Sequence, residues 1–381
     1  MLKVLLFSPK GAGNHYYGPG ISAYRMYQFR DKNKLSVSLA HGYKEQKKMD
    51  VFDEQYYISD IENNNILSGA GFLINAKKWI KKNAHRFDVI HCLSAFHHSF
   101  MMAVWFERIG VPAVIKISES RHLGFNDSSF TSTLLGLRRY RQKHANEISA
   151  YISISSEIKK KLSDAGIQPE KIHDIPNGVD TQRFSPVNDT EKRRIREKLG
   201  IPHKFTVLFT GSFSARKNPY LIVKAMHELS GSDEIQLILV GPDRDGGIQR
   251  NLIKNFIRKN QINNILMKDF VNEIELYYKA SDIFVLPSNQ EGLSNSMLEA
   301  QACGLPAIVT KISGAEDVVD ESLNGSFIDF STDSIASAIN SYFDDKRKLA
   351  EHSEAARKKI VKSFSTELIL HKHIGLFNTI I

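Results

Sequence analysis

Cysteine is nearly absent from this chain, which has only Cys92 and Cys303 among its 381 residues. Two thiols exclude a disulfide-stabilised scaffold and favour a reducing, cytoplasmic setting. No apolar run approaches the roughly 18–20 residues that a membrane-spanning helix needs. The opening segment, residues 1–7, is too short for a signal peptide and lacks a small-residue cleavage site, so it predicts a first strand instead.

Low-complexity tracts and internal repeats are also missing, which excludes disordered, collagen-like and solenoid classes. Hydrophobic residues make up 42% and charged residues 24%, which is typical of globular proteins, and the length predicts two domains or three. The net charge of +9 lies wholly in residues 1–186, which hold 26 basic and 17 acidic residues, whereas the remainder is balanced. A basic half favours an anionic partner, although no recognised module indicates nucleic acid.

Short apolar runs alternate with longer segments of helical periodicity, the pattern of a parallel sheet built from βαβ units. The predicted strands of the first half are residues 4–7, 36–40, 89–93, 113–117 and 150–154. After a turn-rich segment the pattern restarts, with predicted strands at 205–210, 235–240, 283–287 and 307–310. The sequence therefore predicts an α/β protein of two doubly wound domains, residues 1–182 and 183–365, facing across a cleft. A helix at 366–381 is a candidate for packing back on the first domain.

The first segment with the chemistry of a binding site is residues 210–219, which follow a predicted strand and lead into a helix near Pro219. Such a junction presents free backbone N–H groups at the positive end of a helix. Arg216 and Lys217 add fixed positive charge there. The segment favours a pyrophosphate site, with a solvated Arg-Lys pair as the alternative interpretation.

The second segment is residues 287–306, where a strand again leads into a loop and a helix. Ser294 or Asn295 is a natural N-cap. Glu291 lies in the loop and Glu299 about one turn inside the helix. Two carboxylates at this spacing suit the paired hydroxyls of a sugar or ribose, and the free N–H groups at the helix start suit a phosphate oxygen. Glu299 as an ordinary surface residue is the alternative.

The closest resemblance to a known family lies in the pattern Glu291-Gly-x6-Glu299-Ala-x-Ala-Cys-Gly-x-Pro306. It resembles the Glu-x7-Glu signature of retaining glycosyltransferases of family 4, whose GT-B fold has two Rossmann-like domains. Further matching segments are Asn177-Gly-Val-Asp180 with Phe184-x-Pro186, Gly211-x5-Lys217, Leu239-Val-Gly241, Tyr277-x2-Ala-Ser-Asp-Ile-Phe-Val-Leu-Pro-Ser288 and Asp88-Val-Ile-His91. The resemblance runs along most of the chain and is weakest in the last part of the N-terminal domain.

The resemblance implies a nucleotide diphosphate sugar as donor, bound in the C-terminal domain. Lys217, helped by Arg216, would bind the pyrophosphate and stabilise it as it leaves. Glu291 would contact hydroxyls of the sugar, and Glu299 would hold the ribose. The predicted catalytic residues are thus Lys217, Arg216 and Glu291. The other predicted donor-binding residues are Gly18 and Gly20 in a glycine loop after the first strand, Gly211, Ser212, Phe270, Gly292, Leu293, Ser294 and Asn295. A simple turn is the alternative for the Gly-Pro-Gly segment.

Two positions depart from the family pattern. Ser212 stands where the family usually has an Arg, and Arg216 is a candidate to supply that charge. Ser118 stands where the family often has a His near the reacting carbon. Glu119 and His122 lie close by as further acceptor-side candidates, or no side-chain base is needed.

No carboxylate-rich metal motif is visible, and the adjacent pair His97-His98 points in different directions. Preorganised cations and helix N-termini can stabilise a leaving pyrophosphate, so no metal or other cofactor is expected. His91, at a strand end, is interpreted as a histidine of the core or rim.

Two basic segments carry much of the positive excess, residues 77–82 with four lysines and an aromatic, and residues 130–144 with apolar and basic faces on a helix. Such segments bind anionic membrane surfaces, and a solvated domain face is the alternative. They place the protein peripherally at the inner face of the membrane.

The resulting hypothesis is a retaining transferase that moves a hexose or N-acetylhexosamine from a nucleotide diphosphate sugar, UDP favoured over GDP, to a glycolipid or lipid-linked oligosaccharide in cell-envelope polysaccharide synthesis. A soluble glycosyltransferase or phosphorylase with a small acceptor is one alternative. An inactive binding subunit of a polysaccharide assembly complex is another.

Overall fold

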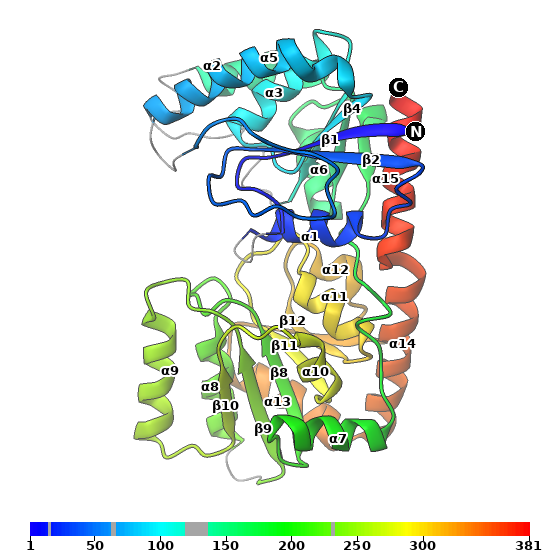
Figure 1. The fold of residues 1–381 in the computed structure, drawn as a ribbon. Helices are drawn as coiled ribbons and strands as arrows, with labels where there is room; N and C mark the ends of the chain where they lie inside the picture. Colours follow the sequence, from blue (N-terminus) through cyan, green and yellow to red (C-terminus); the bar gives the residue numbers. More distant parts are fainter. Residues whose placement is uncertain (14–16, 62–65, 119–135, 230–232) are drawn as a thin grey trace. The chain divides into compact units, whose positions relative to one another are not determined.

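The computed structural model describes residues 1–13, 17–61, 66–118, 136–229 and 233–381. The chain divides into two compact units (Figure 1). The N-terminal unit comprises Met1–Gly178 and Thr366–Ile381, and the C-terminal unit comprises Val179–Ser365. The change of unit lies inside the turn-rich segment in which the sequence analysis placed the boundary.

The N-terminal unit is built on a parallel sheet whose order, within the described residues, is β3-β2-β1-β4-β5-β6-β7. Its strands are β1 (Leu2–Ser8), β2 (Leu35–His41), β3 (Gln55–Tyr57), β4 (Val89–Cys92), β5 (Ala113–Ile117), β6 (Ala150–Ser153) and β7 (Ile172–Asp174). The sequence analysis missed β3 and β7, because three residues at a sheet edge are too few to show a period.

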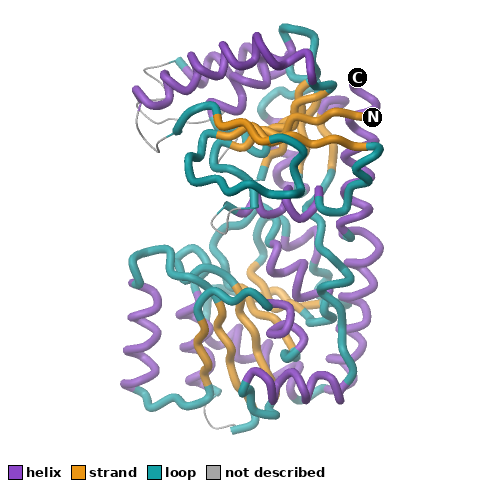
Figure 2. Tube along the Cα trace, in the orientation of Figure 1, coloured by secondary structure: helices purple, strands orange, loops and turns teal. Residues whose placement is uncertain are grey.

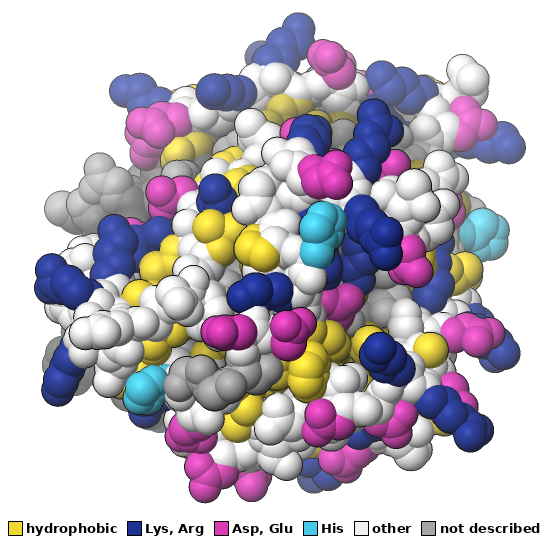
Figure 3. All heavy atoms as spheres, turned by 90° about the horizontal axis from the view of Figure 1, so that it is seen from below, with side chains coloured by type: hydrophobic (Ala, Val, Ile, Leu, Met, Phe, Trp, Pro, Cys, Tyr) yellow, Lys and Arg dark blue, Asp and Glu magenta, His cyan; other side chains and the backbone are white. Residues whose placement is uncertain are grey.

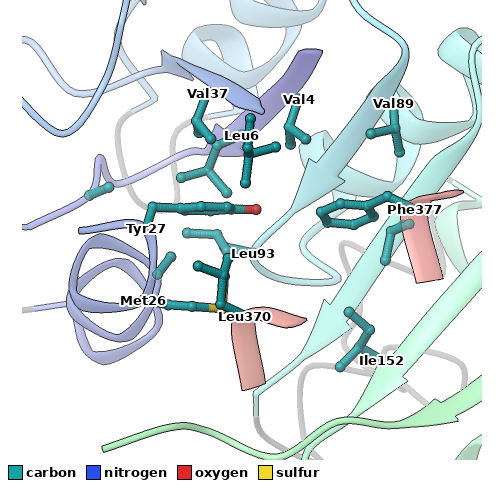
Figure 4. Close-up of a cluster of buried hydrophobic side chains, with 14 of the residues drawn as sticks. Val4, Leu6, Met26, Tyr27, Val37, Val89, Leu93, Ile152, Leu370 and Phe377 are labelled. Carbon is teal, nitrogen blue, oxygen red and sulfur yellow. The ribbon is translucent and has the colours of Figure 1, made fainter. Parts of the chain in front are cut away.

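Helices cover both faces of this sheet (Figure 2). They are α1 (Gly18–Tyr27), α2 (Ile66–Asn83), α3 (His97–Glu107), α5 (Leu137–His144), α6 (Ser156–Asp164) and α15 (Thr366–Ile380), with 3-10 turns η1 (Ala84–Arg86), η3 (Ala145–Glu147) and η4 (Pro169–Lys171). Leu6 of β1 belongs to one buried cluster with Tyr27 of α1 and Phe377 of α15 (Figure 4). The next residue, Phe7, points to the opposite face, where its ring lies 5.9 Å from that of Phe72 in α2.

The C-terminal unit is built on a second parallel sheet, ordered β10-β9-β8-β11-β12-β13 in the part of the unit that is described. Its strands are β8 (Phe205–Thr210), β9 (Ile235–Val240), β10 (Ile265–Lys268), β11 (Ile283–Leu286), β12 (Ala307–Thr310) and β13 (Gly325–Ile328). Its helices are α7 (Asp189–Leu199), α8 (Pro219–Glu228), α9 (Ile248–Lys259), α10 (Ile274–Lys279), α11 (Asn295–Ala302), α12 (Ala315–Val318), α13 (Thr332–Phe343) and α14 (Lys346–Phe364). The four predicted strands of this unit are found within one residue of their expected bounds, and the edge strands β10 and β13 were missed.

The order of the second sheet determines where its ligand site can lie. β8 comes first in sequence, yet it lies in the interior, with β9 on one side and β11 on the other. The connections after β8 and β11 therefore run in opposite directions away from each other, which opens a crevice at the carboxyl ends of these two strands. The loops of both segments singled out in the sequence, residues 210–219 and 287–306, follow these strands.

Candidate functional site

The loops after β8 and β11 are joined by backbone and side-chain bonds. The N–H of Asn289 donates to the carbonyl of Arg216 at 2.8 Å. The guanidinium of Arg216 donates to the carbonyl of Gln290 at 2.7 Å. These bonds fix the position of each loop relative to the other, although about seventy residues separate the two loops along the chain.

Three predicted catalytic side chains meet at this junction. Nζ of Lys217 lies 2.6 Å from Oε1 of Glu291, and the guanidinium of Arg216 lies 2.9 Å from the same oxygen. Lys217 is only 8% exposed. One carboxylate therefore holds two cations at the carboxyl ends of the two central strands.

The charges at this junction oppose the effect of burial. Burial alone would raise the pKa of the Glu291 carboxyl, but the neighbouring Lys217 and Arg216 hold that pKa below its usual range. Glu291 is therefore ionised at neutral pH. The cluster then carries one net positive charge, which is suited to an anionic ligand.

The start of the loop after β8 is a place of close backbone approach. Gly211 has φ +153, and its N–H donates to the carbonyl of Val240 at 3.0 Å. A Cβ on Gly241, which follows β9, would lie 1.9 Å from the carbonyl oxygen of Gly211. Only glycine fits at 241, so the loops after β8 and β9 touch. Ser212 is half-buried in this loop.

Helix α11 presents the second predicted segment. Ser294 is its N-cap and accepts a hydrogen bond from the N–H of Met297, and Asn295 is the first helical residue. Leu293 is buried, and the carbonyl of Gly292 accepts from the hydroxyl of Ser313 at 3.4 Å. A small cavity opens beside this helix start, lined among others by Glu291 and Ser294.

Glu299 is not an ordinary surface residue of its helix. Its side chain is buried, and its Oε2 accepts a hydrogen bond from the hydroxyl of Tyr278 at 2.8 Å. That hydroxyl lies 2.5 Å from Oγ1 of Thr210, the last residue of β8. The sequence analysis missed Tyr278 and Thr210, because a tyrosine and a strand threonine carry no signal that separates them from core residues.

Gly314 is a further residue that the sequence analysis missed. It has φ +73, and a Cβ there would lie 2.2 Å from the carbonyl oxygen of Gly292. The backbone of the segment after β12 is therefore in close contact with the loop that contains Glu291. A glycine after a strand was the only available signal, and it does not reveal the partner.

Phe270 follows β10 and is 51% exposed. The neighbouring loops are linked by Arg250 of α9, which bonds to the carbonyl of Gly241 at 2.8 Å, to Asp243 at 2.9 Å and to Asp269 at 2.8 Å. Arg250 thus holds the segments after β9 and β10 together.

The predicted glycine loop of the N-terminal unit needs correction. Gly18 and Gly20 lie in the first turn of α1, so the Gly-Pro-Gly segment is neither a loop nor a turn. A Cβ on Gly20 would lie 2.6 Å from the carbonyl oxygen of Gly11, whereas one on Gly18 would meet nothing within 4 Å. The close approach at Gly20 is therefore with the segment after β1 itself, where Gly11 and Gly13 have positive φ.

The acceptor-side candidates are only partly described. Ser118 follows β5 and is half-buried, and its Oγ has no hydrogen-bond partner within the structure. Glu119 and His122 lie outside the described residues.

His91 lies in the core of the N-terminal unit, as the sequence analysis expected. It is fully buried, its Nδ1 lies 2.9 Å from the hydroxyl of Tyr27, and its ring lies 5.4 Å from that of His373 in α15. Lys116 of β5 is buried as well, and burial lowers its pKa to about 8.

Among the residues that the structure describes, no group of three or more His, Cys, Asp or Glu side chains has the arrangement to hold a metal ion. No described helix combines the length and the apolar character needed to cross a bilayer.

Two family models match the chain. Residues 36–183 match the model described as Glycosyltransferase Family 4, and residues 191–359 match the model described as Glycosyl transferases group 1. Together they span most of both units.

Similar proteins support the same assignment. The Escherichia coli protein named UDP-Gal:alpha-D-GlcNAc-diphosphoundecaprenol alpha-1,3-galactosyltransferase is 29% identical over 311 residues, which cover 80% of this chain and 78% of that protein. A Corynebacterium glutamicum protein, named GDP-mannose-dependent monoacylated alpha-(1-6)-phosphatidylinositol monomannoside mannosyltransferase, is 26% identical over 280 residues, 71% of each chain. The solved structure of Anabaena Alr3699/HepE in complex with UDP and glucose matches the full length of both chains with a TM-score of 0.80 at 18% identity. With the two parallel sheets, this likeness confirms the expected GT-B fold.

Proposed function

Because this chain belongs to the family 4 glycosyltransferases and is a nucleotide-sugar transferase with the GT-B fold, we propose that it moves a hexose or N-acetylhexosamine from a UDP-sugar to a lipid-linked acceptor, with retention of configuration. The acceptor class is a glycolipid or lipid-linked oligosaccharide of cell-envelope polysaccharide synthesis. UDP is preferred to GDP as the nucleotide.

The observation that carries the donor half of this proposal is the cluster of Lys217, Arg216 and Glu291 at the carboxyl ends of β8 and β11. Transfer from a nucleotide diphosphate sugar expels a diphosphate, on which negative charge develops as the bond to the sugar breaks. Cations that are already held in place by a carboxylate stabilise that charge with little reorganisation. Lys217 and Arg216 have this position, and Arg216 supplies the charge that Ser212 lacks.

The remaining roles are part of the same proposal. Glu291 accepts hydrogen bonds from hydroxyls of the donor sugar, and Glu299 from the ribose diol. The backbone N–H groups of residues 292–295, at the start of α11, bind a phosphate oxygen. Phe270 and the segment after β9 line the pocket for the base. The acceptor hydroxyl passes its proton to the leaving diphosphate oxygen on the same face, so no side-chain base and no metal enter the scheme.

The acceptor half of the proposal has two supports. The names of the Escherichia coli and Corynebacterium glutamicum relatives described above give lipid-linked acceptors. The N-terminal unit also has a basic surface on α2, where Lys77, Lys78, Lys81 and Lys82 are exposed, no acidic residue occurs, and Ile74 is 59% exposed.

Helix α5 of the same unit also has exposed basic residues. Arg138, Arg139 and Lys143 are exposed, while Arg141 is buried with its guanidinium 5.9 Å from the ring of Phe100 in α3. Residues 130–135 of the predicted basic segment lie outside the described residues. On the face that Figure 3 draws, by contrast, cationic and anionic side chains are interspersed. A cationic face with exposed apolar groups favours docking on the anionic inner leaflet, at about 1 kcal/mol per basic residue.

The donor site is tested by thermal stabilisation with UDP-, GDP-, ADP- and dTDP-sugars, on wild type and on Glu299→Ala. A ligand that binds only the folded state must raise the unfolding midpoint. We expect a shift with UDP-sugars that the variant loses, and the control Glu316→Ala, an exposed residue paired with Lys311, keeps it. No shift with any donor would contradict the proposal and favour an inactive binding subunit.

The acceptor side is tested by sedimentation with anionic and neutral vesicles. The variant in which the four lysines of α2 are replaced by glutamine should lose binding to anionic vesicles. A matched control replaces four exposed lysines of the C-terminal unit, Lys254, Lys259, Lys346 and Lys358. Equal sedimentation of both variants would contradict docking through α2 and favour a soluble enzyme with a small acceptor. Transfer assays with and without EDTA test the metal-free scheme.

A further inference from the structure

Tyr278 is a buried polar residue that the proposed scheme leaves without a role. It lies in α10 and is fully buried. Its ring packs edge-on against that of Phe184, with centroids 5.7 Å apart. It also packs at a tilt against the ring of Phe284, with centroids 6.3 Å apart. Aromatic packing of this kind is satisfied by phenylalanine as well, so the hydroxyl needs its own explanation.

The hydroxyl of Tyr278 joins the end of β8 to Glu299. It donates its single proton to Oε2 of Glu299 at 2.8 Å. Its oxygen is then free to accept from the hydroxyl of Thr210, 2.5 Å away. The direction of the chain is therefore Thr210 to Tyr278 to Glu299, and every link in it is buried.

The chain has a fixed direction because Tyr278 stays protonated. Burial, and then the charge of Glu299, raises the pKa of the Tyr278 hydroxyl well above its usual value. The tyrosine therefore remains protonated, and a donor to the carboxylate, at neutral pH.

We propose that Tyr278, held by Thr210, is a positioning residue that sets the rotation of the Glu299 carboxylate so that it accepts both hydroxyls of a ribose. This inference rests on the proposed function, in which Glu299 holds the ribose of the donor. A carboxylate binds a vicinal diol well in one plane only. A hydrogen bond to one of its oxygens, from a rigid phenol, fixes that plane before the ligand arrives.

The inference predicts an effect on one part of the ligand only. Without the Tyr278 hydroxyl the carboxylate can rotate, and the ribose diol loses its preorganised partner. The diphosphate, held by the cluster of Lys217, Arg216 and Glu291, keeps its contacts. Binding of a ribonucleotide should therefore weaken roughly tenfold, while binding of the 2′-deoxyribonucleotide, which has no diol, changes little.

The experiment is calorimetric titration of UDP and 2′-deoxy-UDP, with GDP and 2′-deoxy-GDP in parallel, into wild type, Tyr278→Phe and Tyr277→Phe. We expect wild type to prefer the ribonucleotide and Tyr278→Phe to lose most of this preference. Tyr277→Phe is the matched control, because the hydroxyl of this adjacent, buried tyrosine makes no hydrogen bond to any residue that the structure describes. It should behave as wild type.

Thr210 gives a second, independent pair of variants. Thr210→Val removes the donor to the phenol and should reduce the preference for ribose, and Thr210→Ser, which keeps a hydroxyl, should restore it. Should Tyr278→Phe not fold, this pair decides the question. Equal weakening of ribose and deoxyribose nucleotides in the variants, or no change, overturns the inference. Wild type that binds neither ribonucleotide overturns the proposed function itself, and the inference with it.

Discussion

Nζ of Lys217 lies 2.6 Å from Oε1 of Glu291, although the two residues belong to loops that follow different strands. In this arrangement the carboxylate neutralises part of the positive charge that a diphosphate needs. Arg216 contacts the same oxygen at 2.9 Å. A ligand phosphate and Glu291 therefore compete for the same two cations.

This competition predicts opposite effects on binding and on transfer for Glu291→Gln. The amide has the size of the carboxylate but no charge, so UDP should bind several-fold more tightly, while transfer slows by at least about tenfold because the contact to the sugar hydroxyls weakens. Calorimetry with UDP and a transfer assay with the UDP-sugar measure the two effects. Glu316→Gln, at an exposed ion pair with Lys311, should change neither. Weaker UDP binding in Glu291→Gln would show that the carboxylate does not compete.

Gly314 predicts a coupling between the segment after β12 and the donor loop. Gly314→Ala adds a Cβ 2.2 Å from the carbonyl oxygen of Gly292 and also strains a backbone with φ +73. Gly200→Ala, at the C-cap of α7, is the matched control, because its φ of +66 brings the same strain with nothing within 4 Å of the new Cβ. We expect Gly200→Ala to lower the free energy of unfolding by about 1 kcal/mol and to leave UDP binding intact. Gly314→Ala should lower it by more, about 2–4 kcal/mol, and weaken UDP binding. Urea unfolding and calorimetry measure both, and equal losses in the two variants would exclude the clash.

The buried His373 predicts acid destabilisation of the N-terminal unit. Burial, and then the charge of Lys116, lowers its pKa from 6.5 to about 3. Between about pH 3 and pH 6.5 this histidine is therefore protonated in the unfolded chain and neutral in the folded chain. Its contribution to the free energy of unfolding is complete above pH 6.5 and is lost as the pH falls towards 3.

His373→Gln should remove one such proton, so its free energy of unfolding should fall by about 1.4 kcal/mol less per pH unit in this window. Urea titrations at several pH values give the slope. His203→Gln, at an exposed histidine, is the control and should leave the slope unchanged. If His373→Gln leaves the dependence of the free energy of unfolding on pH unchanged, His373 is not the source of the acid destabilisation.

Lys116 predicts a stabilising substitution. The side chain is 5% exposed, burial lowers its pKa from 10.5 to about 8, and no carboxylate among the described residues pairs with it. Between about pH 8 and pH 10.5 this lysine is protonated in the unfolded chain but neutral in the folded chain. The free energy of unfolding that is present above pH 10.5 is therefore reduced as the pH falls towards 8.

Lys116→Met should therefore raise the free energy of unfolding at pH 7 by about 1–3 kcal/mol, and the gain should vanish above pH 10.5. Urea unfolding at the two pH values measures it. Lys254→Met, at an exposed lysine of α9, should stay within about 0.5 kcal/mol of wild type. If Lys116→Met lowers the free energy of unfolding at pH 7, the buried charge of Lys116 does not destabilise the protein.

Much of the fold could be read from local pattern. The strands β8, β9 and β12 have the predicted bounds, because a strand buried on both faces of a parallel sheet is a nearly continuous apolar run. Edge strands such as β3 and β10 were missed, because partly exposed strands have no such run. Gly18 and Gly20 were assigned to a loop, because a Gly-Pro-Gly segment gives the same local signal at a turn and at the first turn of a helix.

The sequence alone determined which residues have the chemistry of the site. The type and spacing of three residues after predicted strands mark them as candidates, namely Lys217, Glu291 and Glu299. A short polar segment between an apolar run and a helix can be recognised from the sequence alone. Tertiary structure alone decided which of them meet. The order of the second sheet places β11 beside β8, so Lys217 pairs with Glu291. Glu299 accepts instead from Tyr278, whose hydroxyl also contacts Thr210. Such pairings depend on strand order, and strand order is set by packing across the whole unit rather than by neighbours along the chain.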